Sequence, residues 1–496
     1  MRRVPLAAAI ATSVVFIAGC ASDPGEPTDS RSYYFEQEIE WEDCDSGAQC
    51  AVVRAPLNWD DLDSRQDIEL ALSRHTATGE AQGSLLVNPG GPGASGFTFV
   101  RDSVDFAVGA ALRESFDIVG WDPRGVNEST PVSCATSDAD LDYFFFGELE
   151  AEADTPEWDE ELLAESIRFG TECLDKTGDL LQYVDTMSTV RDLDLLRHLL
   201  GDDQLNYLGY SYGTLIGALY IDTFPENVGR LVLDGPVDPA ASQFDLVLNQ
   251  YRGFEEALMA YVDHCIERGI CPFDGDRDAQ LASVSELYDR LEEDPLRHSD
   301  GRLVDDSMLR TAMVTTLYSQ DNWSYLTQLF VEIDQGLTDT AMFLVDFYYD
   351  RQDGVYQDNS MEAFIAINCL DYPVEYDPEV IAAQGEQLRE VAPYTARPSE
   401  YGDLVCQNWP FPPRLVKGPV SGEGANPVLV IGTTGDPATP YNWSLSLADQ
   451  LGQARHLTLE AEGHLAYNKD SLCINDAVEK YFLTGALPED GLICSS

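Results

Sequence analysis

Short apolar runs alternate with amphipathic stretches along most of the chain from about residue 33 onward. Continuous Leu, Val and Ile runs are typical of strands buried on both faces of a parallel sheet, whereas apolar residues three and four positions apart predict helices. The alternation predicts an α/β fold, a mostly parallel sheet flanked by helices. The predicted strands are Ile68–Arg74, Ser84–Asn88, Phe116–Trp121, Leu205–Gly209, Arg230–Asp234, Val428–Gly432 and His456–Glu460.

The strand pattern stops after Asp238 and resumes only at Val428. The sequence between them is rich in helical patterns, such as those of Phe254–Arg268 and Met308–Tyr318. We therefore expect a mostly helical cap at residues 240–424, inserted between core segments at 33–239 and 425–496. A cap inserted there would cover the carboxyl ends of the strands, where ligands bind in open α/β sheets.

The first twenty residues resemble an export signal. Arg2 and Arg3 precede an apolar run, Val4–Ala18, that is too short to span a bilayer comfortably. The run ends in Ile-Ala-Gly-Cys20, which resembles a bacterial lipobox, in which Cys20 would be lipidated and become the mature N-terminus. An ordinary secretory peptide cut nearby is the alternative. Residues 21–32 have the composition of a flexible tether, so we expect an exported protein whose only membrane contact is a lipid anchor on the extracellular face.

The cysteine content fits an oxidising compartment. The chain has 11 cysteines, and setting Cys20 aside leaves an even number. No CxxC pair or histidine cluster accompanies them, so we expect no metal site and no cofactor. Sequence alone does not fix the connectivity. Pairing by proximity would give Cys44–Cys50, Cys134–Cys173, Cys265–Cys271, Cys369–Cys406 and Cys473–Cys494.

The charge balance is strongly acidic, with 88 acidic residues against 29 basic ones and a formal net charge of −59. Such a chain would repel nucleic acid, which excludes it as a partner. The acidity suits a hydrated surface in high salt or outside the cell. Alternatively, part of it lines an active site that attracts cationic substrates, and the total charge does not separate the two.

The strongest chemical signal is the sequence Gly-Tyr-Ser-Tyr-Gly at residues 209–213. It follows an apolar strand and precedes the helical run Thr214–Asp222. This is the arrangement of a nucleophile elbow, in which small flanking residues allow a tight turn and the serine hydroxyl stands above the sheet. We predict Ser211 as the nucleophile. The alternative is a glycine-rich turn with a surface serine.

A serine nucleophile needs a histidine base, which in this fold follows it in the chain. His464 stands in a turn just beyond the last predicted strand and is the candidate. His456 begins that strand and is more plausibly structural, while His264 and His298 fall in the cap.

The acid that orients the histidine is expected in a loop past a late strand. Asp436 fits this position, because it lies in a Gly- and Pro-framed loop just after the strand that begins at Val428. Asp234, which closes the preceding strand, is the competitor, with Asp238 behind it.

The tetrahedral oxyanion needs backbone N–H donors, commonly from the loop after the third strand and from the residue after the nucleophile. The glycine-rich loop Asn88–Gly93 follows a predicted strand. We assign the oxyanion hole to the amides of Gly91 and Tyr212. A phosphate-binding loop is excluded, because no Gly-Lys-Ser/Thr follows the glycines.

With these motifs, the chain resembles the secreted tripeptidyl aminopeptidases and proline iminopeptidase relatives of actinobacteria, serine exopeptidases of the α/β-hydrolase fold. The resemblance runs from about Trp41 to the C-terminus. Proline iminopeptidases begin the oxyanion loop with His-Gly-Gly, whereas Asn88-Pro89 precedes Gly90 here, which weighs against strict iminopeptidase specificity. The motifs that support the resemblance are Asn88–Gly96, Trp121–Gly125, Gly209–Thr214, Ala366–Asp371, Cys406–Pro410, Gly435–Pro440 and Gly463-His464.

The resemblance implies a serine aminopeptidase that releases tripeptides, or single residues, from peptides with a free N-terminus. It also implies carboxylates near the cap that bind the substrate α-ammonium, since an ammonium in a dry cleft needs a paired charge. Glu362 and Asp371 are the candidates, with solvated surface as the alternative for each. Two other functions stay open: a cell-surface carboxylesterase or lipase with the same triad, and a non-catalytic peptide-binding lipoprotein.

Overall fold

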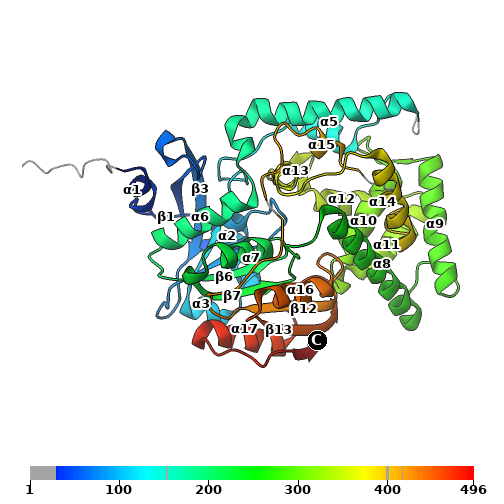
Figure 1. Cartoon of the computed structure of the whole chain (residues 1–496). Coiled ribbons are helices and arrows are strands. Elements are labelled where there is room, and N and C mark those ends of the chain that lie inside the picture. The colour runs from blue at the N-terminus through cyan, green and yellow to red at the C-terminus, as the bar shows by residue number, and fades with distance from the viewer. Residues whose placement is uncertain (1–28, 152–154, 398–401, 416, 496) are drawn as a thin grey trace, which may run out of the picture.

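A computed structural model of the chain describes residues 29–151, 155–397, 402–415 and 417–495 (Figure 1). The predicted signal peptide, with Cys20, and the tether up to residue 28 lie outside the described residues. The last residues of the predicted tether enter a helix, α1 (Ser30–Phe35), which begins at Ser30 rather than near Tyr33. None of the described helices is long and apolar enough to cross a membrane.

A mixed sheet forms the centre of the core. Within the described residues it has ten strands in the order β1-β2-β3-β5-β4-β6-β7-β12-β13-β14. Neighbours from β1 to β5 run antiparallel, and neighbours from β5 through β14 run parallel. All seven predicted strands are present, with small shifts at their ends. The bounds are β1 Glu42–Asp43, β2 Gln49–Pro56, β3 Asp67–His75, β4 Ser84–Asn88, β5 Asp117–Trp121, β6 Leu205–Tyr210, β7 Val228–Asp234, β12 Leu429–Gly435, β13 Arg455–Glu462 and β14 Leu492–Ser495.

Helices cover both faces of the sheet. Alternate residues of a strand point to opposite faces, so Leu85 and Val87 pack in one apolar cluster and Leu86 in the other. One face is covered by α2 (Gly96–Ala107), α3 (Ala110–Ser115) and α17 (Leu472–Thr484). The opposite face is covered by α6 (Thr186–Leu199), α7 (Gly213–Thr223) and α16 (Tyr441–Leu451). This architecture confirms the predicted α/β-hydrolase fold.

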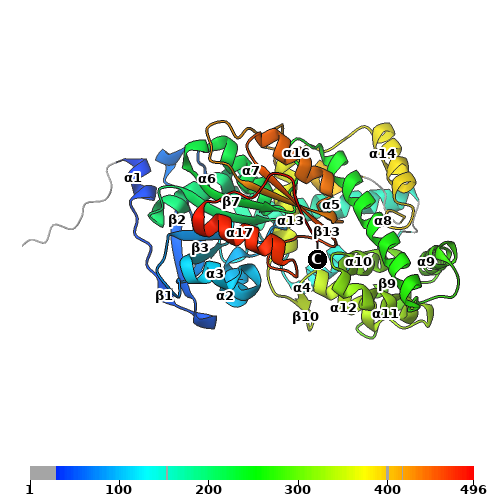
Figure 2. The same cartoon turned by 90° about the horizontal axis from the view of Figure 1, so that it is seen from below.

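The segment between β7 and β12 is mostly helical, as expected. Figures 1 and 2 show that α8 to α12 and α14 lie to one side of the sheet, where α8 to α12 pack around an apolar cluster of their own. Two short hairpins, β8 (Leu296–Arg297) with β9 (Leu303–Val304) and β10 (Arg351–Gln352) with β11 (Val355–Tyr356), lie between the helices. The helices are α8 Gln243–Arg268, α9 Arg277–Glu293, α10 Asp306–Leu317, α11 Trp323–Asp334, α12 Asp339–Tyr348, α13 Ser360–Asp371, α14 Pro378–Val391 and α15 Leu404–Gln407.

Packing does not follow the chain order strictly. Helix α13 lies within the inserted segment, yet Ala363, Ala366 and Leu370 join the apolar cluster of the core. Helices α4 (Asp138–Phe146) and α5 (Pro156–Thr177) precede the insertion, but α5 runs along α13 and α15 (Figure 1). The boundaries at residues 240 and 424 therefore stay a prediction from the sequence.

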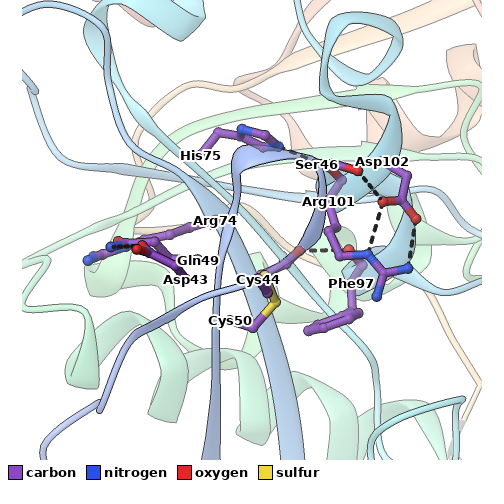
Figure 3. Close-up of a disulfide and its surroundings, with 11 residues drawn as sticks. Asp43, Cys44, Ser46, Gln49, Cys50, Arg74, His75, Phe97, Arg101 and Asp102 are labelled. Carbon is purple, nitrogen blue, oxygen red and sulfur yellow. Dashed lines mark hydrogen bonds and ion pairs between the residues drawn. A yellow bond between two sulfur atoms is a disulfide. The ribbon is translucent and has the colours of Figure 1, made fainter.

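Five disulfides link the described part of the chain, and they are the five pairs that proximity predicts. Cys44–Cys50 closes the loop between β1 and β2, and Ser46 in that loop donates a hydrogen bond to Asp102 of α2 at 2.8 Å (Figure 3). Cys369–Cys406 ties α13 to α15. The disulfides thus fasten peripheral segments to the core, which is consistent with an oxidising compartment.

The Trp121–Gly125 motif holds the sheet to its surrounding loops. Asp122 accepts hydrogen bonds from the Ser95 hydroxyl at 2.6 Å and the Phe97 amide at 3.1 Å, which fixes the start of α2. Burial raises the pKa of the Asp122 carboxyl to about 6. Arg124 is fully buried and forms an ion pair with Asp192 at 2.6 Å. The motif therefore supports the strand ends beside the glycine-rich loop and supplies no reacting group.

Candidate active site

Ser211 stands on a strained turn between β6 and α7. Its φ of 53° lies in the left-handed region, which a serine adopts only where the surroundings force it. The turn leaves no room for side chains beside it: a Cβ at Gly209 would come within 2.5 Å of the Gly213 carbonyl oxygen, and one at Gly213 within 2.7 Å of Asn88 Oδ1. The geometry is that of a nucleophile elbow.

His464 is held by Asp436. Its Nδ1 lies 2.9 Å from each carboxylate oxygen of Asp436, which is 3% exposed. The amides of Ala438 and Thr439 and the Thr439 hydroxyl donate further hydrogen bonds to the same carboxylate, at 2.9 to 3.0 Å. A hydrogen bond from Nδ1–H to the carboxylate fixes the ring orientation and leaves Nε2 as the atom that can accept a proton.

The competing acids have other partners. Asp234 accepts hydrogen bonds from the amides of Ala466 at 3.0 Å and Tyr467 at 2.8 Å, so it fixes the backbone just after His464. Asp238 accepts a hydrogen bond from the Gln450 side chain at 2.7 Å. Asp436 is thus the one of the three carboxylates that hydrogen-bonds the ring in the described structure.

The remaining downstream histidines have structural surroundings. On β13, His456 Nε2 lies 2.8 Å from the hydroxyl of Ser444 on α16, and burial lowers the pKa of the His456 imidazole. His264 packs edge-on against Trp323 in the cap, with ring centroids 5.2 Å apart. His298 Nδ1 lies 2.9 Å from the Thr338 hydroxyl.

The Ser211 turn and the His464 side chain both lie against Asp234-Gly235. The Ser211 amide donates a hydrogen bond to the Asp234 carbonyl at 3.0 Å. A Cβ on the next residue, Gly235, would lie 3.3 Å from Cε1 of His464. Within the described part of the chain, neither the Ser211 hydroxyl nor Nε2 of His464 has a hydrogen-bond partner. Catalytic hydrogen bonds of free enzymes are often long and tighten when substrate binds.

The predicted oxyanion donors also lie beside the elbow. A Cβ on Gly90 would come within 2.9 Å of the Ser211 Cβ and 3.0 Å of the Tyr212 nitrogen, so the glycine-rich loop touches the turn. Among the described residues, the amides of Gly91 and Tyr212 donate to no protein acceptor. Both are therefore left for a ligand, as an oxyanion hole requires.

Asp371 is buried at the end of α13, where it is linked through Thr186 to the Tyr212 side chain of the elbow. It is fully buried, and its carboxylate accepts hydrogen bonds from the Thr186 amide at 2.9 Å and from the Thr186 hydroxyl. The Tyr212 hydroxyl in turn hydrogen-bonds Thr186. Burial raises the pKa of Asp371 to about 7, and the Lys417 ammonium opposes that rise. The carboxylate predicted to bind substrate thus has protein partners and orients the Tyr212 side chain.

Glu362, the other predicted ammonium ligand, is also buried and has a protein partner. It is 7% exposed and accepts a hydrogen bond from the Cys134 amide, and burial raises its pKa to about 7. In this structure it faces the disulfide-linked loop rather than a ligand site. Nothing in the sequence pattern distinguishes these two buried carboxylates from solvated ones.

Two residues at the site could not be found from the sequence. Tyr318, at the end of α10, accepts a hydrogen bond from the His464 amide through its carbonyl at 2.8 Å, and its ring packs edge-on against the imidazole. Thr439 Oγ1 lies 3.0 Å from Asp436 Oδ2 and 3.2 Å from His464 Nδ1. The first contact crosses from cap to core, and sequence spacing carries no sign of it.

Comparison with known proteins places this geometry in context. Residues 392–494, which include Asp436 and His464, match the family model described as TAP-like protein. The chain is 35% identical to the serine protease Hip1 of Mycobacterium tuberculosis over 98% of this chain and 96% of that protein. It is 33% identical to carboxylesterase B of the same species, over 97% and 94%, and 29% identical to the tripeptidyl aminopeptidase of Streptomyces coelicolor, over 92% and 86%.

Proposed function

This chain belongs to the TAP-like family of α/β-hydrolase serine hydrolases, and we propose that within this family it is an exported aminopeptidase that releases tripeptides, or single residues, from peptide N-termini. The proposal rests on one observation above the others. A histidine held by a buried carboxylate, with both Asp436 oxygens 2.9 Å from Nδ1, stands beside a serine on a strained elbow.

The proposed reaction begins when the Ser211 hydroxyl oxygen attacks the scissile carbonyl carbon. Nε2 of His464 takes the hydroxyl proton as the new C–O bond forms, and Asp436 stabilises the imidazolium through Nδ1–H. The carbonyl oxygen becomes an oxyanion that accepts hydrogen bonds from the amides of Gly91 and Tyr212.

Collapse of this intermediate breaks the C–N bond. The leaving amine takes the proton from His464 Nε2 and departs, which leaves an acyl ester on Ser211. A water molecule then attacks the ester, giving its proton to Nε2, and the second collapse releases the acid and returns that proton to the serine oxygen. The sequence consumes one water for each bond cleaved.

The choice of peptide substrates is supported by relatives whose names are serine protease and tripeptidyl aminopeptidase. Export and anchoring are supported by the signal-like residues 1–20, by the lipobox-like end at Cys20 and by five disulfides. In the proposed picture the enzyme works at the outer face of the membrane, with no cofactor and no nucleic-acid partner.

The test is to incubate the purified enzyme with a mixed peptide library and identify the released fragments by mass spectrometry. The proposal predicts N-terminal fragments of one to three residues, and none from peptides with acetylated N-termini. Internal cleavage, or cleavage that is indifferent to acetylation, would contradict it. A Ser211→Ala variant is the control for contaminating peptidases.

A second candidate, a carboxylesterase, is favoured by the 33% identical relative of that name. The same triad hydrolyses esters, because the fold does not fix the leaving group. Tripeptidyl anilides assayed beside p-nitrophenyl esters separate the two. Activity on esters alone would make the carboxylesterase the correct function.

A further inference from the structure

Arg310 is a part-buried arginine on α10 in the cap. Two other arginines whose side chains are little exposed meet carboxylates: Arg124 pairs with Asp192 at 2.6 Å and Arg302 with Asp346 at 2.6 Å. Arg310 has no carboxylate within ion-pair distance among the described residues. Its Nη1 donates to the Tyr251 hydroxyl at 3.2 Å, and its Nε is buried without a partner.

This isolation is unexpected in a chain with 88 acidic and 29 basic residues. A charge partly withdrawn from water without a counter-charge destabilises the fold, so such a group is retained where a ligand supplies the opposite charge. The Tyr288 hydroxyl, which interacts electrostatically with Arg310, is also buried and has no hydrogen-bond partner among the described residues. Within the described part of the cap, Arg310 Nε and the Tyr288 hydroxyl are thus both unsatisfied.

Tyrosines surround the Arg310 guanidinium. Tyr348 and Tyr349 interact electrostatically with the guanidinium, and burial raises the pKa of both phenols. Tyr348 is nevertheless 39% exposed. Solvent therefore reaches at least one of the tyrosines around the guanidinium.

The helix that carries Arg310 ends beside the candidate active site, because Tyr318 is the C-cap residue of α10. The Tyr318 ring centroid lies 5.7 Å from that of His464. Arg310 and Tyr318 stand eight residues apart on and at the end of α10, which corresponds to about 12 Å along a helix axis. An extended peptide covers about 12 Å with three to four residues.

We propose that Arg310 is the anchor of a carboxylate subsite that selects peptides with an acidic residue about three positions from the bond that is cut. The inference rests on the proposed function, because it concerns the substrate of the same site. A guanidinium binds a carboxylate through two parallel hydrogen bonds, and tyrosine hydroxyls can donate alongside it. The strongly acidic surface repels acidic peptides, so an unpaired cation in the cap gives the site its selectivity.

The carboxylate could come from either side of the scissile bond, and paired substrates distinguish the sources. One pair carries Glu or Gln three residues before the bond, and the other carries Glu or Gln three residues after it. The measured quantity is the ratio of kcat/KM for the Glu peptide to that for its Gln isostere. We expect a ratio of about ten in one of the two pairs for the wild type, as a charge-assisted hydrogen bond supplies.

Arg310→Gln should reduce that ratio to about one, and Arg310→Lys should retain part of it, because lysine keeps the charge but not the planar fork. Arg268→Gln, which removes an exposed charge from α8 of the same cap, should leave the ratio unchanged. A ratio of one in both pairs for the wild type, or an equal ratio in Arg310→Gln, would overturn the subsite. The wild-type ratio alone decides the matter if Arg310→Gln does not fold.

Failure of the proposed function is distinguishable from failure of the subsite. If the wild type hydrolyses p-nitrophenyl acetate but cleaves neither peptide pair, the aminopeptidase proposal fails. If it cleaves both members of each pair at equal rates, the peptidase stands and the carboxylate subsite falls.

Discussion

The carbonyl of Tyr318 accepts a hydrogen bond from the His464 amide at 2.8 Å, and the rings of the two residues pack edge-on with centroids 5.7 Å apart. A helix of the inserted segment thus holds the loop that carries the candidate base. An isolated bridge between Ser319 and Gly463 extends the same contact along the backbone. The inserted segment therefore helps to position the histidine.

Removing the Tyr318 ring should loosen the imidazole. We expect Tyr318→Ala to lower kcat about tenfold, because small displacements of a catalytic group reduce rates steeply. Tyr318→Phe keeps the edge-on contact and should retain nearly the full rate. Steady-state kinetics on a p-nitrophenyl ester measures both. An unchanged kcat in Tyr318→Ala would show that the contact does not position His464.

The hydroxyl of Thr186 connects Asp371 to Tyr212, whose amide is an assigned oxyanion donor. Without this link the Tyr212 side chain loses a hydrogen-bond partner. We therefore expect Thr186→Val to lower kcat about three- to tenfold. KM should change little, because the oxyanion forms only in the transition state. Thr186→Ser keeps the hydroxyl and should restore the rate. A rise in KM with kcat unchanged would contradict this role.

The buried Arg124–Asp192 pair should be needed for stability rather than chemistry. Arg124→Met leaves Asp192 buried without its counter-charge and should reduce the free energy of unfolding by about 3–5 kcal/mol. In the double variant Arg124→Met, Asp192→Leu the orphaned charge is gone, and we expect most of the loss to be recovered. Urea unfolding of the three proteins measures this. A double variant as unstable as the single one would refute the explanation.

Glu362 predicts a pH dependence of stability. Its folded pKa of about 7 lies above the ordinary value of 4.5, because burial disfavours the carboxylate. Between these values the folded state binds a proton that the unfolded state has released, so this group makes the protein less stable as pH rises from 4.5 to 7.

The Glu362→Gln variant should lose this contribution. From pH 4.5 to 7, the free energy of unfolding of Glu362→Gln should rise by about 2–3 kcal/mol relative to that of the wild type. Its melting temperature should rise relative to that of the wild type over the same interval. Glu379→Gln removes an exposed carboxylate from α14 and is the matched control. Parallel melting curves for Glu362→Gln and wild type from pH 4.5 to 7 would contradict the prediction.

The sheet was largely predictable because its central strands are continuous apolar runs. Ser84–Asn88 agrees with β4 to the residue, since all five side chains are buried. Strand β2, Gln49–Pro56, was missed because it alternates buried and exposed residues, with Val52 55% exposed. Strand β14 is too short, at four residues, to give a pattern.

At the site, chain order and loop position predicted Asp436 and His464, and the structure brings these two residues together. Residues that act through tertiary contact were not predictable. The contact between Thr186 and Asp371 joins positions 185 residues apart. Arg310 has no ion pair with a described residue because no described carboxylate lies within reach of it in the fold. Glu362 and Asp371 were chosen from the family resemblance and their position at the Ala366–Asp371 segment, neither of which reveals that a carboxylate is buried.

The most direct test of the account is labelling with a fluorophosphonate, read by intact mass and peptide mapping. A serine activated by His464 should form one covalent adduct per chain, on Ser211, and Ser211→Ala should form none. Labelling of His464→Ala should be slower by a factor of about 10³ or more, because the hydroxyl loses its base. A folded wild-type protein that is not labelled at Ser211, or one labelled as fast without His464 as with it, would contradict the account.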